Sequence, residues 1–200
     1  LEARKAGVES LINSANVHDY APVGCLENTM VGNDRSGTVD DNLNLLKAVE
    51  LTLTGGYDMN PVVDALTGLP TKLTLDGVDT GDPETFATWE QFWQAYVNQT
   101  RHIIKLSVDT YEKSEAIRAR FFQTPYLSCL VKGCAAKGKD INQGGPELNF
   151  VTVEAVTYAT TVDSLLAVKY LVYDKKVCSM KELVAALRAN WVGHEKLQAI

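Results

Sequence analysis

The feature that most constrains the fold of this chain is a long helical pattern from about residue 88 to about residue 121. Thr88-x-x-Gln91 is a capping-box signature, in which two side chains satisfy backbone groups at the start of a helix. Apolar and aromatic side chains then recur close to helical spacing: Trp89, Phe92, Trp93, Tyr96, Val97, Ile103, Ile104, Val108 and Tyr111. Such a stripe is typical of core packing rather than of a cofactor site. We therefore predict one long helix with a buried apolar side.

A strand followed by a helix is predicted in the second half of the chain. Residues 150–158 alternate and are rich in β-branched side chains, which indicates a strand. Thr161 is predicted to cap a helix over residues 162–172. A strand that leads into a helix, after earlier helices, is typical of a βα unit in a parallel barrel or sheet. The sequence therefore predicts an α/β fold.

Shorter elements are predicted on both sides of the long helix. Before it, we expect a helix at residues 2–15, a helix capped by Asp40 or Asp41 and ended by Gly55-Gly56, and connecting structure at 57–85 with a short strand at 72–75. After it, we expect a helix from Pro125 to Gly138, a helix from the capping box Ser179-x-x-Glu182 to Asn190, and a last helix from His194.

Composition excludes several classes of protein. The chain has 200 residues, is 46% hydrophobic and carries 19 Lys and Arg against 25 Asp and Glu, so it can bury a substantial core in one or two domains. It has no basic run for nucleic acid, no apolar run of about 18 residues for a membrane span, and no signal-peptide pattern. Four cysteines are too few for a disulfide scaffold, which favours a reducing cytosol. Of these, Cys129 and Cys134 are interpreted as core residues rather than metal ligands.

The stretch from Ala21 to Met30 is the candidate for chemistry. Cys25 follows a glycine, Glu27 lies two residues on, and no regular apolar period runs through these residues. Turn-forming residues follow, so we predict that Cys25 lies on an irregular loop. Such a loop can present a reactive thiol, but a free cysteine is also among the most buried residue types. His18 is a candidate base or simply a solvated histidine.

Two separate motifs resemble one family. Gly-Cys-Leu-Glu at 24–27 resembles the Gly-Cys-x-Glu motif of the glycyl radical enzymes related to pyruvate formate-lyase. Gly138-Lys139-Asp140, Gly144-Gly145, Asn149-Phe150 and residues 161–169 resemble the family's Gly-Gly-x-x-x-Asn stretch and the Ala-Asp-Ser-Leu-Ala-Ala-x-Lys-type helix after it. The resemblance covers essentially all 200 residues, but only an internal part of the family's longer chain.

The resemblance implies a fold, a cofactor and partners. The fold is part of the family's ten-stranded α/β barrel with long peripheral helices, and residues 1–200 are expected to be an internal segment of one barrel domain, truncated at both ends. The radical glycine lies outside this segment, and no metal is expected in the chain itself. The implied partners are a radical S-adenosylmethionine activating enzyme, a small organic substrate and a second copy in a homodimer. The implied location is cytoplasmic.

The resemblance also implies roles for Cys25 and Glu27. In the family the cysteine becomes a thiyl radical that takes hydrogen from a substrate carbon, and the glutamate handles a proton. Residues i and i+2 of an extended stretch point the same way, so both side chains can face one substrate. Two ordinary alternatives are a thiolate activated by a histidine and a glutamate that only binds loop amides.

Three other residues are weaker candidates for substrate binding. Arg35 has the planar fork that binds carboxylates, but it can equally pair with Asp34 or Asp40 to pin the loop. Glu154 is a carboxylate inside a predicted strand, where it must be hydrogen-bonded or functional if it faces a barrel interior and is unremarkable if it faces out. His18 is the third.

The reaction within the family is predicted from local departures. Cys25 has no cysteine neighbour, so formate acetyltransferase activity is not expected. Asn28 follows Glu27 where dehydratases and amine-lyases usually have proline, and Pro146-Glu147-Leu148 replaces the family's Ala-Arg-Tyr. We therefore predict decarboxylation of an arylacetate such as 4-hydroxyphenylacetate. The alternatives are dehydration of diols or hydroxyproline, C–N or C–S lysis, and a non-catalytic globular fragment. The isolated chain is expected to be inactive, because nothing in it holds the radical.

Overall fold

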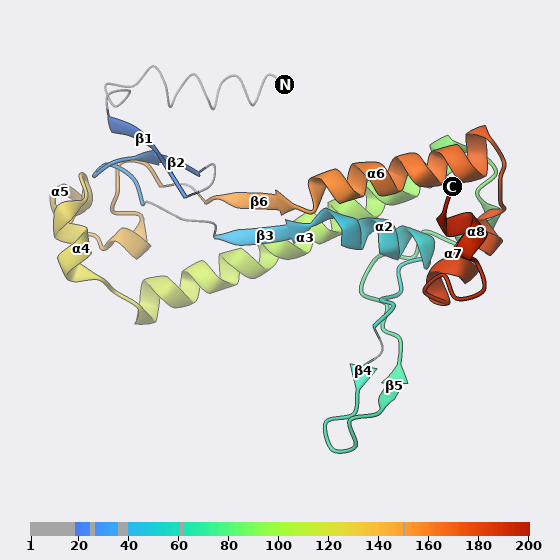
Figure 1. Ribbon diagram of the computed structural model, residues 1–200. Coiled ribbons are helices and arrows are strands. Elements are labelled where there is room, and N and C mark those ends of the chain that lie inside the picture. Colours follow the sequence, from blue (N-terminus) through green and yellow to red (C-terminus); the bar gives the residue numbers. More distant parts are fainter. Residues whose placement is uncertain (1–18, 25–26, 36–39, 61, 150) are drawn as a thin grey trace. The chain divides into compact units, whose positions relative to one another are not determined.

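The structure is a computed structural model, and it describes residues 19–24, 27–35, 40–60, 62–149 and 151–200 (Figure 1). The helix predicted at residues 2–15 lies outside the described residues. The chain divides into two compact units: Leu1–Asn42 with Ser107–Glu154, and Leu43–Leu106 with Ala155–Ile200. The long helix α3, Trp89–Phe121, contributes to both units and confirms the predicted helix.

The first unit contains a small antiparallel hairpin. Strand β1, Tyr20–Val23, pairs with β2, Glu27–Met30, in a register that sets Tyr20 opposite Met30 and Val23 opposite Glu27 (Figure 1). The predicted irregular stretch is therefore mostly strand, and three residues connect the two strands. Four-residue strands place only two side chains on each face, which is too few for a sequence period to reveal.

The helix predicted from Pro125 to Gly138 is two helices. Helix α4, Pro125–Leu130, begins with proline at the first turn as expected, and Gly138 in the left-handed conformation ends α5, Cys134–Lys137. Gly133 separates them with φ of 94°, where a Cβ atom would lie 2.9 Å from the carbonyl oxygen of Gly145. The chain leaves the helix at Val131, whose backbone is extended, and glycine is needed at position 133 because the neighbouring backbone leaves no room for a side chain.

The end of the first unit holds a small apolar cluster. The 3-10 helix η3, Ile141–Gln143, is capped by the carboxylate of Asp140. Ile141 of this helix packs against Val131 and Cys134. Cys134 is buried as predicted, whereas Cys129 is exposed, so the core interpretation was wrong for Cys129.

Strand β3, Asp41–Asn44, pairs with β6, Val153–Val156. The prediction that Asp40 or Asp41 caps the next helix was wrong, because those residues enter the strand. Asn44 caps α2, Leu45–Leu53, by accepting a 3.2 Å hydrogen bond from the backbone of Lys47. Gly55 and Gly56 follow α2 with positive φ, as predicted for a helix end.

In the second unit, helix α6, Tyr158–Val168, begins earlier than predicted and continues into a π-helix, η4, Lys169–Asp174. Thr161 is therefore inside the helix, and its hydroxyl donates to the carbonyl of Thr157 at 2.8 Å. Thr157 occupies the capping position with φ of 64°, which is rare for a β-branched residue. Its hydroxyl accepts from the backbone of Leu46 and donates to Asn44, which offsets the strain.

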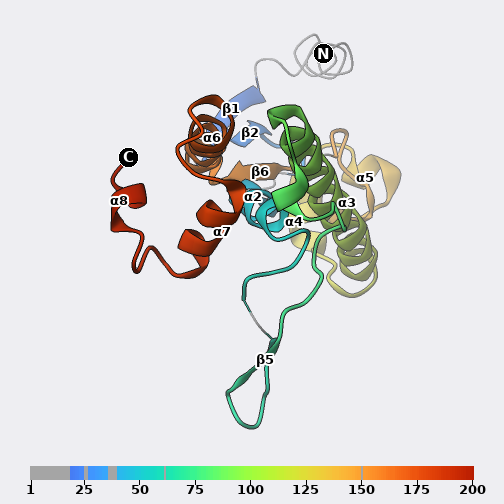
Figure 2. The ribbon, with the colours of Figure 1, turned by 90° about the vertical axis from the view of Figure 1, so that its right-hand side faces the viewer.

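The last two predicted helices are present. Ser179 and Glu182 form the predicted capping box of α7, Met180–Arg188, and α8, Glu195–Gln198, follows His194. The core of the second unit joins residues of α2, α3, α6 and α7 (Figure 2): Ala48, Val49, Leu53, Phe92, Tyr96, Leu165, Val168, Met180, Leu183 and Val184. The apolar stripe of α3 is core at Phe92 and Tyr96, as predicted, but Trp93, Ile104 and Val108 are exposed.

A β-hairpin projects from the second unit. Strands β4, Val62–Val63, and β5, Pro70–Lys72, extend away from the helices (Figures 1 and 2). The strand predicted at 72–75 is thus displaced toward the N-terminus. The 3-10 helix η2, Pro83–Thr85, leads into α3. Within the described residues, no helix combines the length and apolarity needed to cross a membrane.

Replacing Phe92 by Ala should lower the free energy of unfolding of the 200-residue chain by about 3–5 kcal/mol, because this side chain is fully buried in the core. Phe121→Ala, in the same helix but 66% exposed, is the matched control and should change stability by less than about 0.5 kcal/mol. Urea unfolding followed by circular dichroism measures both. Equal losses would contradict the assignment of the core.

Candidate active site

The β1–β2 hairpin carries the predicted catalytic residues. Cys25 and His18 lie outside the described residues. Glu27 is the first residue of β2, and its backbone pairs with Val23 of β1. Gly24 has φ of 62°, a conformation that glycine adopts without steric cost. The chain on either side of Cys25 is therefore held in a paired, extended conformation.

A turn of residues 31–35 follows β2 and closes on Met30. The carbonyl oxygen of Met30 accepts from the backbone N–H groups of Asn33 at 2.9 Å and of Asp34 at 3.2 Å. The Met30 N–H donates to Oδ2 of Asp34 at 2.6 Å. Both backbone groups of the last residue of β2 are thus bound by the turn, so the hairpin ends at a fixed point.

The same turn is tied to a distant part of the first unit. The Lys132 N–H donates to the Gly32 carbonyl at 2.8 Å, and the Leu148 N–H donates to the Asn33 carbonyl at 3.2 Å. The Leu148 carbonyl in turn accepts from the Arg35 N–H at 3.2 Å. These backbone bonds fix the base of the hairpin without relying on particular side chains.

Arg35 lies at the end of this turn and is 8% exposed. Its guanidinium contacts Glu115 Oε2 at 2.5 Å, Asp40 Oδ1 at 3.1 Å and the Tyr111 hydroxyl at 2.7 Å. Of the two pairings considered from the sequence, the structure has the one with Asp40. The guanidinium pins the loop to α3, and a role in substrate binding stays a prediction.

One side of α3 binds Asp40 and Asp41, which lie at the start of β3. The Ser107 hydroxyl donates to Asp41, and the Tyr111 hydroxyl donates to Oδ1 of Asp40 at 3.1 Å. Ser107, Tyr111, Glu115 and Arg118 follow helical spacing, so they share one face. We call these four residues the polar stripe of α3. The sequence analysis missed it because the aromatic residues dominate the helix pattern, although the spacing of the four polar residues was visible.

Asp40 joins this stripe to the start of β6. Its Oδ2 accepts from the Thr152 backbone N–H at 3.0 Å and from the Thr152 hydroxyl at 3.3 Å. The Asp40 side chain is 7% exposed. A buried carboxylate is costly unless it is paired and hydrogen-bonded, and here both conditions are met.

Burial shifts the pKa values of the groups around Arg35. Burial alone would lower the pKa of Arg35, but the hydrogen bond to Tyr111 and the charges of Glu115 and Asp40 outweigh it, and the net shift is upward. Burial raises the pKa of Tyr111, and the bond from Arg35 opposes the rise. The guanidinium therefore stays charged and the phenol stays neutral at ordinary pH.

Asp34 is in a less favourable environment. Burial raises the pKa of its carboxyl, and the hydrogen bond from Met30 only partly compensates. Its Oδ1 atom is enclosed without a hydrogen-bond partner, and so are both amide atoms of Asn33. Each buried polar atom that lacks a hydrogen-bond partner lowers the free energy of unfolding by about 1–3 kcal/mol. Three of them would remove a large part of the stability of a typical domain.

Glu154 lies in β6 and is half-buried. It takes no part in the contacts of Arg35 or Asp40 described above. Of the weaker candidates, Arg35 therefore belongs to the polar stripe contacts, Glu154 has no hydrogen bond or ion pair with Arg35 among the described contacts, and His18 lies outside the described residues. Among the residues that the structure describes, no group of three or more His, Cys, Asp or Glu side chains is arranged to hold a metal.

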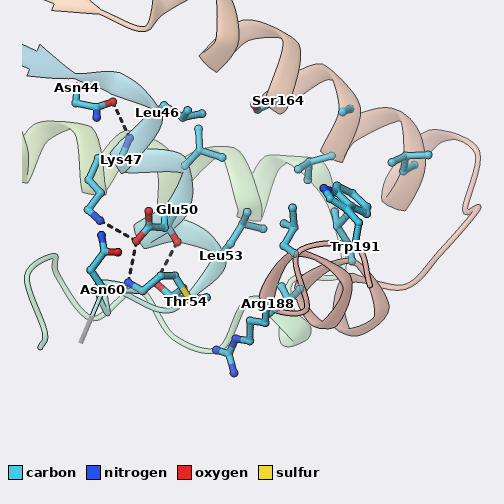
Figure 3. Close-up of a pocket in the computed structure, with 18 residues that line it drawn as sticks. Asn44, Leu46, Lys47, Glu50, Leu53, Thr54, Asn60, Ser164, Arg188 and Trp191 are labelled. Atoms are coloured by element: carbon cyan, nitrogen blue, oxygen red, sulfur yellow. Dashed lines mark hydrogen bonds and ion pairs between the residues drawn. The ribbon is translucent and has the colours of Figure 1, made fainter. Parts of the chain in front are cut away.

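The second unit contains a cavity of about 720 Å³ between α2, α6 and α7 (Figure 3). Its walls are apolar, and one edge carries Lys47, which pairs with Glu50 and with Asp58 at 2.8 Å each. Neither Arg35 nor Glu154, the described candidates for substrate binding, lines this cavity. Its lining comes from three separate helices, so no single stretch of sequence signals it.

Comparison with known proteins shows the family. Residues 2–200 match the family described as pyruvate formate lyase-like, and the chain belongs to this family of glycyl radical enzymes. The chain is 33% identical over 174 residues to trans-4-hydroxy-L-proline dehydratase of Clostridioides difficile, covering 87% of this chain and 20% of that protein. It is 36% identical over 184 residues to isethionate sulfite-lyase of Desulfovibrio desulfuricans, covering 91% of this chain and 21% of that protein.

Solved structures confirm the fold class. The C. difficile hydroxyproline dehydratase with bound substrate matches with a TM-score of 0.80 and 30% identity, over 96% of this chain and 23% of that chain. The B12-independent glycerol dehydratase of Clostridium butyricum matches with a TM-score of 0.81 and 28% identity, over the same shares. The chain is an α/β part of the glycyl radical enzyme barrel and spans about a fifth of the length of these relatives.

The relatives bear on the predicted reaction. They are dehydratases and sulfite-lyases, and they do not support the predicted likeness to 4-hydroxyphenylacetate decarboxylase. Dehydration, which the sequence left as an alternative, fits them better. Decarboxylation, which was drawn from Asn28 and residues 146–148, is therefore not supported by these relatives.

Replacing Arg35 by Met should lower the free energy of unfolding by about 2–4 kcal/mol, because it removes the buried guanidinium that pairs with Asp40 at 3.1 Å and leaves that largely buried carboxylate only the longer 3.9 Å ion pair with Arg118. The matched control is Arg118→Met, which removes a 40% exposed guanidinium from the same stripe and should cost less than about 1 kcal/mol. Urea unfolding of the 200-residue chain measures both. If the two variants lost equal stability, Arg35 would not be the residue that fixes the loop.

Proposed function

We propose that this chain is an internal catalytic segment of a glycyl radical dehydratase, which removes water from a small polyhydroxylated or hydroxylated substrate. The observation that carries the proposal is the Gly24-Cys25-Leu26-Glu27 motif in a chain whose relatives include hydroxyproline and glycerol dehydratases. Elimination of sulfite is the second candidate, supported by 36% identity to an isethionate sulfite-lyase.

The residue types fit this chemistry. The glycyl radical of the family, on a glycine outside these residues, supplies the unpaired electron. The Cys25 sulfur exchanges hydrogen readily, because an S–H bond is weak enough to give and take a hydrogen atom with an activated carbon. The O–H bond of a serine is too strong for this exchange. The paired strands on either side of Cys25 supply the fixed backbone that such an exchange needs.

In the proposed reaction, Cys25 acts as a thiyl radical, because the glycyl radical of the longer protein would have taken the hydrogen atom of its thiol. The Cys25 sulfur then takes a hydrogen atom from the substrate carbon and becomes a thiol again. For a 1,2-diol, the carboxylate of Glu27 takes the proton of the hydroxyl on that carbon and gives the same proton to the hydroxyl on the neighbouring carbon, which leaves as water, so that Glu27 ends as a carboxylate. The thiol of Cys25 then returns its hydrogen atom to the product. Atoms balance, because the only molecule lost is water.

The remaining roles are proposals for the longer protein. A radical S-adenosylmethionine enzyme would install the radical, and a homodimer in the cytoplasm is expected from the family. Residues 1–200 would form one segment of a single barrel domain. Because the radical glycine lies elsewhere, the 200-residue chain alone is expected to show no turnover.

Cys25→Ala should abolish turnover in the activated longer protein, because it removes the hydrogen-atom relay. Glu27→Gln should leave the glycyl radical signal unchanged in electron paramagnetic resonance and slow turnover by about 10²–10⁴-fold, because it removes an acid–base group. Glu112→Gln, at an exposed position of α3, is the matched control and should have no effect. Unchanged turnover in Glu27→Gln would exclude the acid–base role.

A substrate panel tests the reaction class. The anaerobically activated protein is expected to dehydrate at least one of trans-4-hydroxy-L-proline, glycerol and 1,2-propanediol, and to leave 4-hydroxyphenylacetate unchanged. Product analysis by mass spectrometry measures this. Turnover of isethionate alone would favour the sulfite-lyase alternative, and turnover of the arylacetate alone would overturn the proposal.

A further inference from the structure

The turn of residues 31–35 encloses three polar atoms that the fold itself does not satisfy. These are Nδ2 and Oδ1 of Asn33 and Oδ1 of Asp34, none of which has a hydrogen-bond partner. Asn33 is 1% exposed and Asp34 is 2% exposed. Native proteins satisfy nearly all buried polar groups, so an enclosed cluster of this kind requires a partner.

We propose that the turn of residues 31–35 is an internal water-binding site, in which one or two ordered water molecules bridge the amide of Asn33 and Oδ1 of Asp34. The site is separate from the Cys25 and Glu27 chemistry and does not depend on the proposed reaction.

Neighbouring backbone groups cannot take the place of the water. The Met30 N–H already binds the other oxygen of Asp34 at 2.6 Å, which fixes the carboxylate. The Met30 carbonyl accepts from Asn33 and Asp34, and the Gly32 carbonyl accepts from Lys132. Because the three polar atoms are enclosed, a further segment of a longer protein or a large ligand cannot reach them either.

The chemistry of the three atoms selects water over an ion. They comprise one donor group and two acceptors, and exchanging the oxygen and nitrogen of the Asn33 amide leaves the same set. Water both donates and accepts, and a buried water makes about three hydrogen bonds. The two oxygens could bind a metal cation, but the N–H groups of the amide would repel it. Ca²⁺ also takes about six to eight oxygen ligands, more than the two available here.

The site lies at the foot of the hairpin. Asp34 binds the backbone of Met30, the last residue of the strand that begins with Glu27. A bound water would hold the free oxygen of Asp34 and so keep the carboxylate in the orientation that binds Met30. The water would therefore contribute to the rigidity of the β1–β2 hairpin.

Nuclear magnetic resonance of the ¹⁵N-labelled 200-residue chain tests the site. The side-chain NH₂ of Asn33 should show cross-relaxation with a long-lived water, whereas the exposed NH₂ of Asn42 should show only exchange with bulk solvent. A crystal structure should place a water within hydrogen-bond distance of Asp34 Oδ1 and of the Asn33 amide. In Asn33→Ala, hydrogen exchange at the Met30 N–H should accelerate about tenfold or more, and in the control Asn42→Ala it should not change.

Several results would overturn the proposal. One is a direct hydrogen bond between the side chains of Asn33 and Asp34, with no water between them. A second is a cation at the site, revealed by a thermal shift on adding EDTA or by metal–oxygen distances in the crystal. A third is equal solvent exchange at the NH₂ groups of Asn33 and Asn42, which would show that the site is open.

Discussion

The interaction on which the first unit most depends is the buried guanidinium of Arg35. It contacts Asp40, Tyr111 and Glu115 at once, and so joins the turn after β2 to the polar stripe of α3. An arginine suits this position, because its charge is permanent and its planar fork can meet several acceptors in fixed directions. A lysine would offer a single point charge to the same partners. The contact between the turn and α3 therefore depends on the shape of the Arg35 side chain as much as on its charge.

Local signals in the sequence predicted the fold well where a few neighbouring residues decide the structure. The capping boxes at Thr88 and Ser179 are examples, because each is complete within four residues. The start of α2 and the start of α6 could not be predicted in this way. Asp40, Asp41 and Asn44 all have capping side chains, and pairing with β6 decides between them. That strand lies more than a hundred residues away, so no local pattern in the sequence can predict which of the three residues caps α2.

The candidate site was predicted in part. The motif around Cys25 and Glu27 pointed to the family, which the comparison over residues 2–200 confirms, because the motif is short and continuous in the sequence. The polar stripe of α3 was not found, since four polar positions spread over twelve residues are a weak signal beside a row of aromatic side chains. The cavity between α2, α6 and α7 was not found either, because its lining is assembled only when the helices pack. The substrate preference drawn from Asn28 was not supported by the relatives, because a single position beside the motif does not describe the rest of a binding site.

The contact between Asp40 and Thr152 spans 112 residues of sequence. During synthesis the ribosome releases the hairpin long before it releases the strand that secures the loop beside it. Until then the loop can be held only by α3, which emerges at an intermediate time. The β1–β2 hairpin is thus among the first described parts of this chain to be made, and the contacts beside it are among the last to form.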